Sequence, residues 1–270
     1  MRHARILVLF VALVVVASFA LVQPAVSGAE LSGSITLAGS TSVQPLADEL
    51  AAAFMAKNRK VKVNVQGGGS GAGIKGALEG TCDIGMSSRE LKPEETGLFE
   101  TIVARDGIAV VVHRSNPVSD LSLEQIQGIY AGRITNWSQV GGKNQSILVV
   151  TREEGSGTRG AFEEIVMGKA KIVATANVQP ATGAVRVTVA GAPQAIGYVS
   201  LGALTSEVKA VRVGGVEANA ESIIQGRYRI QRPFLFLTRG KPEGLAKAFI
   251  DFCLSPEGQE IVAMDYIRVR

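Results

Sequence analysis

The sequence predicts an α/β protein, because short β-type runs alternate along the chain with runs of helical period. Valines at positions 61, 63 and 65 alternate with polar residues, as in a half-buried strand. Before them, Leu46, Leu50 and Phe54 recur every four residues and so share one face of a predicted helix. Turns rich in serine, threonine and glycine join several of these runs. This alternation favours largely parallel sheets covered by helices.

Later segments extend the same pattern to the end of the chain. Further strands are expected at residues 83–86, 108–113, 147–151, 196–199, 208–213 and 234–238. Ser255 followed by Pro256 predicts the start of a closing helix, with serine as N-cap and proline in the first turn. No internal repeat or low-complexity linker follows residue 29. Any division into lobes must therefore come from the chain crossing over, and residues 106–113 and 228–237 are the candidate crossings.

The first 29 residues predict export from the cytoplasm. Arg2 and Arg5 precede an apolar run at residues 6–22, and Pro24 separates that run from small residues. This is the layout of a secretory signal peptide, with cleavage expected after Ala29 or Ser27. The alternative is an uncleaved membrane anchor, since the run is slightly longer than a usual signal core. We expect a soluble periplasmic protein.

Charge and cysteine content exclude several function classes. The chain has 28 Lys and Arg against 24 Asp and Glu, a balance too mild to indicate a nucleic-acid partner. Cys82 and Cys253 could form one disulfide in an oxidising compartment, but each lies in an apolar segment, which favours two buried thiols. After the predicted signal the only histidine is His113, expected to end a strand. Without a cluster of His and Cys, we expect no metal and no cofactor.

Four turns share one design, in which a strand-like run is followed by small hydroxyl residues and glycine and then by a helical pattern. They lie at residues 39–42, 67–71, 87–89 and 155–158. The first amides of a helix lack internal partners and carry the positive end of its dipole, glycine allows close approach, and hydroxyls add donors. Any one such turn is usually only a helix cap. Their number favours binding of a small oxyanion, such as phosphate.

Arg152 adds charge to the last of these turns. It ends a predicted strand just before Gly-Ser-Gly-Thr at residues 155–158. A guanidinium there can bind phosphate or sulfate with two parallel hydrogen bonds, while a neighbouring carboxylate holds its fork in place. We expect Glu154 to be that carboxylate. The alternative is a solvated surface ion pair.

For the most part, the residue spacing in this sequence does not match the common enzyme motifs. The nucleophile elbow needs Gly-x-Ser-x-Gly, but the fifth residue of the turn at 68–72 is alanine, and Glu154 stands where the later turn needs its first glycine. Residues 71–76 match the dinucleotide fingerprint but begin too far beyond the preceding strand. The Walker pattern is absent. We therefore expect no enzyme activity.

The chain resembles the periplasmic phosphate-binding proteins of phosphate-specific ABC transporters. The similarity runs from about Ile35 to Met264. Its landmarks are Gly-Ser-Thr-Ser at 39–42, Gly-Ser-Gly at 69–71, Asp-Ile-Gly-Met-Ser-Ser-Arg at 83–89, Ile-Thr-Asn-Trp at 134–137, Arg-Glu-Glu-Gly-Ser-Gly-Thr-Arg at 152–159 and Ala-Ile-Gly-Tyr-Val at 195–199.

This resemblance implies a two-lobed binding-protein fold of type II, with a central mixed sheet flanked by helices in each lobe and the ligand in the cleft between lobes. One lobe would comprise residues 30–108 and 231–270, and the other residues 109–230. The implied ligands of inorganic phosphate are Ser42, the Val43 amide, Ser70, Ser88, Arg152, Ser156, the Gly157 amide and Thr158, supported by Thr41, Ser87 and Glu154. The implied partner is the membrane permease of an ABC transporter, and the receptor is expected to be a monomer.

One position departs from part of the family. Some members carry an aspartate in place of Ser88, and that carboxylate accepts the proton that phosphate carries and sulfate lacks. Glu154, or the lone pairs of Ser88, could take that role here. The open alternatives are a receptor for sulfate, molybdate or tungstate, an exported phosphoester hydrolase, or a surface signalling or adhesion module without a small ligand.

Overall fold

The computed structural model describes residues 30–269, so the predicted signal peptide lies outside the described residues. The strands are β1 (Ser32–Gly39), β2 (Lys60–Gly67), β3 (Ile84–Ser87), β4 (Phe99–His113), β5 (Asp120–Leu121), β6 (Leu148–Arg152), β7 (Asn177–Gln179), β8 (Ala195–Ser200), β9 (Val208–Ala210), β10 (Arg212–Val213) and β11 (Gln231–Thr238). The helices are α1 (Gln44–Lys57), α2 (Ser70–Glu79), α3 (Leu123–Tyr130), α4 (Gly157–Phe162), α5 (Thr182–Gly191), α6 (Ala220–Ile224), α7 (Gly244–Cys253) and α8 (Pro256–Asp265).

Most of the predicted elements are confirmed. The valine alternation forms β2, and Leu46, Leu50 and Phe54 are all buried on α1. The Ser255 hydroxyl accepts a hydrogen bond from the Gly258 amide and so caps α8 as expected. Residues 208–213 form two strands instead of one, because β9 pairs with β4 whereas β10 pairs with β5.

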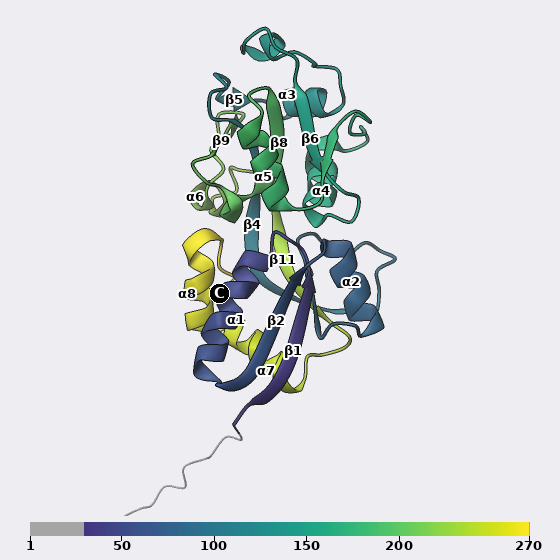
Figure 1. Cartoon of the computed structure of the whole chain (residues 1–270), viewed down its shortest axis with the longest axis vertical. Helices are drawn as coiled ribbons and strands as arrows, with labels where there is room; N and C mark the ends of the chain where they lie inside the picture. Colours follow the sequence, from purple (N-terminus) through teal and green to yellow (C-terminus); the bar gives the residue numbers. More distant parts are fainter. Residues whose placement is uncertain (1–29, 270) are drawn as a thin grey trace, which may run out of the picture. The chain divides into compact units, whose positions relative to one another are not determined.

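The sheet is mixed rather than largely parallel. Its strands follow the order β2-β1-β3-β11-β4-β8-β6-β7, with β9 also beside β4. β1 runs parallel to β2 and β3, and β6 runs parallel to β7 and β8. The antiparallel strands β4 and β11 join these two parallel groups (Figure 1). The expectation of mostly parallel pairing was wrong at these two long strands, since both also pair antiparallel with their outer neighbours.

The first hydrophobic core lies around β1, β2, β3 and β11. Along β11, Phe234 and Phe236 pack with buried residues of α1, α7 and α8. The alternate residues Leu235 and Leu237 pack with Ile74 of α2 on the opposite face. Successive residues of β11 therefore point to opposite faces of the sheet, and helices cover both faces. Because both faces are buried, the residues on each face of β11 must be apolar.

The second core lies around β4, β6 and β8 and shows the same alternation. Ile108, Val110 and Val112 of β4 pack with residues of α3 and α4, whereas Ala109 and Val111 pack with α5. Earlier in β4, Val103 and Ala104 belong to the first core. The strand therefore passes from one core to the other, and the fold is a two-lobed α/β architecture with a mixed sheet in each lobe.

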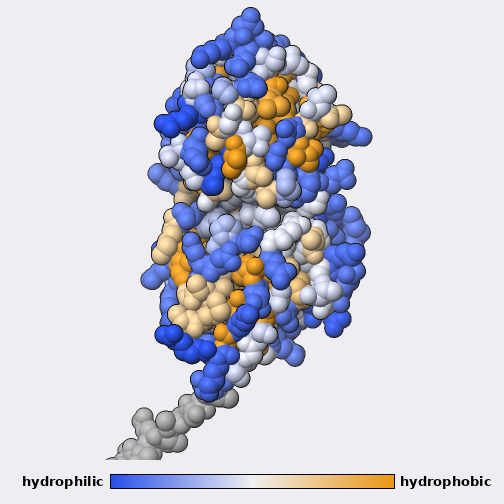
Figure 2. All heavy atoms as spheres, in the orientation of Figure 1, coloured by the Kyte–Doolittle hydropathy of each residue, from blue (hydrophilic) through white to orange (hydrophobic). Residues whose placement is uncertain are grey.

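The face in Figure 2 is mostly hydrophilic, with apolar residues in separate groups. Within residues 30–269, none of the helices has the length and hydropathy needed to cross a membrane.

Both cysteines are free and buried, in agreement with the favoured interpretation. Cys253 lies in the first core at the end of α7, and Cys82 packs beside α2. Burial raises the pKa of both thiols, and that of Cys253 well above its usual value.

We predict that native protein reacts slowly with a thiol-specific reagent and that denaturant exposes two reactive thiols. The buried sulfurs are inaccessible, and their raised pKa values leave little of the nucleophilic thiolate. Spectrophotometric thiol titration with and without denaturant measures this. Fewer than two thiols in denaturant without reductant would show that a disulfide forms.

Candidate functional site

Three of the predicted turns meet at one edge of the sheet in the first lobe. Gly39, at the end of β1, is in register with both Gly67 of β2 and Met86 of β3. Because these strands are parallel, their carboxyl ends lie together. A side chain at residue 39 would place its Cβ 2.3 Å from the Met86 carbonyl oxygen, and Gly39 has a φ of 137°. Glycine is therefore required where the turns converge.

The convergence brings four serine hydroxyls of the first lobe into a buried group. Ser40, Ser42, Ser70 and Ser88 are each at most 3% exposed. Ser40 donates to the Ser88 Oγ at 2.8 Å. Ser70 Oγ accepts from the Ser88 amide at 3.1 Å and lies 3.4 Å from the Ser88 Oγ. These three hydroxyls thus form one hydrogen-bonded chain.

The second lobe contributes Arg152, Thr158 and Thr182. Arg152 ends β6 and is 1% exposed, and its Nη1 donates to the Thr182 Oγ1 at 3.0 Å. Thr158 and Thr182 lie in the first turns of α4 and α5 and are also buried. The end of β6 is held by Tyr198, whose hydroxyl lies 2.7 Å from the Thr151 Oγ1. Burial raises the pKa of Tyr198 to about 12, which keeps this hydroxyl neutral.

The hydroxyls of the two lobes contact one another. Ser42 Oγ lies 2.9 Å from the Thr158 Oγ1 and 2.8 Å from the Thr182 Oγ1. A backbone bond runs alongside, from the Gly71 amide to the Gly155 carbonyl at 2.9 Å. A Cβ at Gly157 would lie 2.2 Å from the Ser70 Oγ, so only glycine allows this approach. The predicted turns of both lobes therefore line a single polar cluster.

The carboxylate that holds Arg152 is Glu153, which corrects the expectation for Glu154. Arg152 Nε donates to Glu153 Oε2 at 2.9 Å, and Nη2 donates to Oε1 at 2.8 Å. In a strand, the side chains of Arg152 and Glu153 would point to opposite faces. They can meet because β6 ends at Arg152 and the chain turns there. The fork is buried and satisfied on one side by a carboxylate, so Arg152 is not a solvated surface pair.

A second buried arginine was missed by the sequence reasoning. Arg232 of β11 lies opposite Asp106 of β4 in the strand register. Its Nη2 donates to the Asp106 Oδ2 at 3.0 Å, and both side chains are at most 1% exposed. Burial raises the pKa of Asp106, while the nearby guanidinium opposes that shift. The available signal was charge inside apolar runs: Arg105 and Asp106 lie in residues 103–112, and Arg232 lies in residues 230–238.

Arg232 also contacts the hydroxyl cluster. Its Nη1 donates to the Ser88 carbonyl oxygen at 3.2 Å and to the Ser88 Oγ at 3.3 Å. The cluster therefore has a guanidinium on each side, Arg152 in one lobe and Arg232 at the crossing strands.

The remaining predicted site residues take various positions. Ser156 caps α4 by accepting from the Arg159 amide, and the Val43 amide donates to the Ser40 carbonyl oxygen at 3.2 Å. Thr41 Oγ1 lies 3.4 Å from the Thr182 Oγ1. Ser87, by contrast, donates to the Arg89 carbonyl oxygen. Ser40, Glu153 and Thr182 join the cluster unpredicted, although Thr182 also begins a helix after a strand, which is the signal that singled out the other turns.

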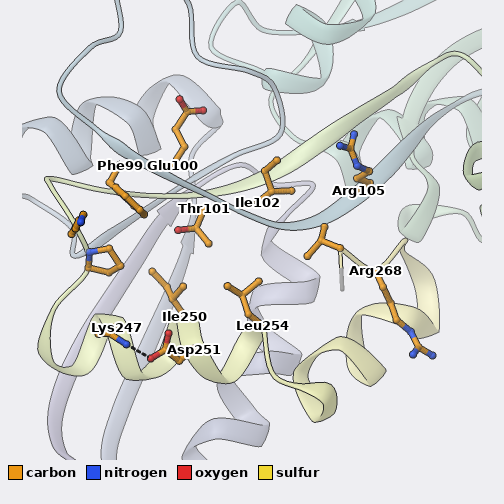
Figure 3. Close-up of a pocket in the computed structure, with 13 residues that line it drawn as sticks. Phe99, Glu100, Thr101, Ile102, Arg105, Lys247, Ile250, Asp251, Leu254 and Arg268 are labelled. Atoms are coloured by element: carbon orange, nitrogen blue, oxygen red, sulfur yellow. Dashed lines mark hydrogen bonds and ion pairs between the residues drawn. The ribbon is translucent and has the colours of Figure 1, made fainter.

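The polar cluster is separate from the cavity shown in Figure 3. That cavity, of about 720 Å³, lies between β4 and α7. Its lining includes the apolar side chains of Ile102, Ile250 and Leu254 and the charged side chains of Arg105 and Arg268. None of the predicted site residues lines it.

Comparison with known proteins places the chain in a family. Residues 24–257 match the model of a PBP superfamily domain. The phosphate-binding protein PstS of Bacillus subtilis is 34% identical over 239 residues, which span 87% of this chain and 79% of that protein. The PstS of Borreliella burgdorferi is 29% identical, over 84% of this chain and 87% of that protein.

Solved structures agree with the sequence relatives. A Clostridium perfringens protein with bound phosphate, described as a phosphate ABC transporter substrate-binding protein, is 45% identical with a TM-score of 0.86, over 88% of this chain and 100% of that one. An ABC-type phosphate transport receptor from Vibrio cholerae is 38% identical with a TM-score of 0.73, over 86% and 99% of the two chains. The chain therefore belongs to the PBP superfamily and, within it, to the family of PstS phosphate-binding proteins.

Proposed function

We propose that this protein is an extracytoplasmic receptor that binds inorganic phosphate and delivers it to the permease of an ABC importer. The observation that carries the proposal is the convergence of Arg152 with hydroxyls of both lobes on one buried cluster. Buried donors around a guanidinium suit a tetrahedral oxyanion, whose oxygens accept hydrogen bonds in several directions. The names of the matched receptors support phosphate as that oxyanion.

We assign the ligand contacts to residues whose donors face the cluster. Ser42, Ser70 and Ser88 would bind from one lobe, and Arg152, Thr158 and the Gly157 amide from the other, with Thr182 added by its contact with Ser42. Ser156 can also donate, because its bond to the Arg159 amide uses a lone pair and leaves its O–H available. The Val43 amide is already directed at Ser40, so we give it a smaller role.

We infer the lobe boundaries from the two strands that pass between the hydrophobic cores. We place residues 30–108 and 231–270 in one lobe and residues 109–230 in the other, with β4 and the segment leading into β11 as the hinge. The site lies where the lobes meet, so rotation about these strands would open and close it, as in hinge closure around a ligand.

Within residues 30–269, the described contacts give no support to the phosphoester hydrolase alternative. His113 ends β4 as predicted, and its ring nitrogen lies 2.8 Å from the Ser115 Oγ. Among the hydrogen bonds described for residues 30–269, none joins His113 to a cluster hydroxyl, so none of these serines has an adjacent histidine base.

Isothermal titration of the signal-free protein with inorganic phosphate is expected to give saturable heat at one site per chain. Light scattering of the same sample should show a monomer, the state in which the lobes can move freely. Absence of heat over a wide range of phosphate concentrations would contradict the proposed function.

Arg152→Met should weaken phosphate binding by about a hundredfold, because a charge-assisted hydrogen bond in a buried site contributes roughly 1.5–3 kcal/mol. Glu153→Gln should weaken binding less, by loosening the fork that it holds. Glu154→Gln is the matched control, because its carboxylate makes no described bond to Arg152, and its affinity should equal that of the unmodified protein. Retained affinity in Arg152→Met would exclude this arginine as a ligand.

We predict export with removal of the leader. Expression in a bacterial host should place the protein in the periplasm, and mass spectrometry should find an N-terminus at Gly28 or Glu30. A chain retained in the membrane with residues 1–29 intact would instead support the uncleaved anchor.

A further inference from the structure

The strand β4 leaves a stretch of its edge open. On one side, β11 pairs with it from residue 99 to residue 107. On the other side, β8 and β9 pair with residues 108–113, and Ile267 pairs with Arg105. Among the described residues, none forms a backbone pair with residues 99–102 on that second side. Residues 99–102 therefore form an open edge of the sheet in the first lobe.

The side chain of Gln259 lies where the covered part of this edge ends. It is buried, its Nε2 donates to the Val103 carbonyl oxygen at 3.0 Å, and its Oε1 accepts from the Val269 amide at 2.9 Å. Next to it, Arg105 and Ile267 exchange two backbone hydrogen bonds, at 2.9 and 3.0 Å. The C-terminal segment and Gln259 thus cover the edge of β4 at residues 103–105.

The open edge offers backbone donors and acceptors to another chain. In an antiparallel pair, alternate residues direct both their N–H and C=O groups toward the neighbouring strand, and the others direct theirs away. Some backbone groups of residues 99–102 therefore point away from β11, and no described hydrogen bond outside the pairing of β4 with β11 uses them. Such a row of polar groups can pair with an extended peptide, which then adds a strand to the sheet.

The cavity of about 720 Å³ lies against this open edge (Figure 3). Residues 99–102 all line it, and Ile250 and Leu254 of α7 line it as well. Phe99 and Ile102 are 39% and 40% exposed, so apolar side chains are accessible along the edge itself. A strand added beside β4 would bury these side chains and so gain hydrophobic contact in addition to its backbone bonds.

The charge of the cavity indicates which peptides suit it. Its lining contains four basic and two acidic side chains, namely Arg105, Lys241, Lys247, Arg268, Glu100 and Asp251. Lys247 is paired with Asp251, but within residues 30–269 no ion pair is described for Arg105, Lys241 or Arg268. These cations favour a peptide with carboxylates. They also oppose a second copy of this chain, which would bring like charges together.

We propose that the open edge of β4 is a docking site for an extended acidic peptide segment of a partner protein, which adds a strand beside residues 99–102. Apolar side chains on one face of that strand would contact Ile250 and Leu254. Carboxylates at one end would meet Arg105 and Arg268, which lie together at one end of the cavity in Figure 3. The proposal is independent of the proposed function, because none of the residues assigned to phosphate lines this cavity.

Fluorescence anisotropy with two labelled peptides tests the charge preference. The probes are Glu-Glu-Val-Thr-Val-Glu-Glu and Lys-Lys-Val-Thr-Val-Lys-Lys, which share an alternating apolar centre. At low ionic strength, the purified exported protein should bind the acidic probe about tenfold more tightly than the basic probe, and added salt should reduce this difference. Equal affinities, or no saturable binding of the acidic probe, would overturn the inference.

N-methylation of the acidic probe tests strand addition. Alternate residues of a strand use opposite edges for their hydrogen bonds, so methyl groups on the amides of one alternate set remove the donors of one edge only. We expect one methylated set to abolish binding and the other to leave it unchanged. If both methylated probes bound, side chains alone would hold the peptide, and the inference would be wrong. Loss of binding in both would equally contradict a strand that pairs through one edge.

Arg105→Glu combined with Arg268→Glu reverses the charge at one end of the cavity. Both side chains are exposed. This variant should bind the acidic probe about tenfold more weakly and the basic probe more tightly, because rim charges set which partner is attracted. Its affinity for phosphate should be unchanged. A dimer of the unmodified protein that this variant abolishes would assign the edge to a second copy instead.

Lys143→Glu combined with Lys169→Glu is the matched control. It makes the same change in net charge, and both lysines are exposed and lie outside the cavity. Its affinity for the acidic probe should equal that of the unmodified protein. An equal loss in this control, or no loss in the arginine variant, would overturn the inference. Circular dichroism checks folding, and if the arginine variant does not fold, the methylated probes decide the question.

Discussion

The ion pair between Asp106 and Arg232 is the interaction on which the arrangement of the site depends. The two residues face each other across β4 and β11, the strands that join both cores. Burying two charges is costly, and removal of one partner from such a pair typically destabilises a protein by about 3–5 kcal/mol. The pair therefore constrains the register of the two strands at this point. Because Arg232 also binds the carbonyl and hydroxyl of Ser88, the same constraint positions the end of β3.

Arg152 and Arg232 occupy similar environments on the two sides of the cluster. Each guanidinium is balanced by a carboxylate and uses a further nitrogen to donate to a hydroxyl, Thr182 for Arg152 and Ser88 for Arg232. The positive charges thus act on the centre of the cluster partly through polarised hydroxyls. In a dry interior such chains of hydrogen bonds strengthen one another. This arrangement lets a small anion meet many donors without leaving a buried cation unpaired.

Much of the fold followed from local patterns, and the errors have definite causes. The valine alternation located β2, and the capping residues located α8, because both features lie within one short segment. The strands β5 and β7 were not predicted, since two or three residues are too few to show a period. Residues 208–213 read as one strand, although their two halves pair with different neighbours. The carboxylate that binds Arg152 is Glu153 and not Glu154, because side-chain direction at the end of β6 depends on the turn that follows.

The sequence by itself determined the types of element, the hydroxyl-rich turns and the presence of Arg152 beside one of them. These are properties of residues close together in the chain, where spacing and propensity decide the outcome. Only the tertiary structure decided that Ser42 meets Thr182, that Gly157 fits against Ser70, and that Arg232 lies behind Ser88. Those contacts join residues far apart in the chain. Strand register brings the ends of β1 and β3 together, and contacts between the lobes bring the turn after β6 to the same place. The turns alone indicated an anion site, whereas the fold decided which groups can donate to it.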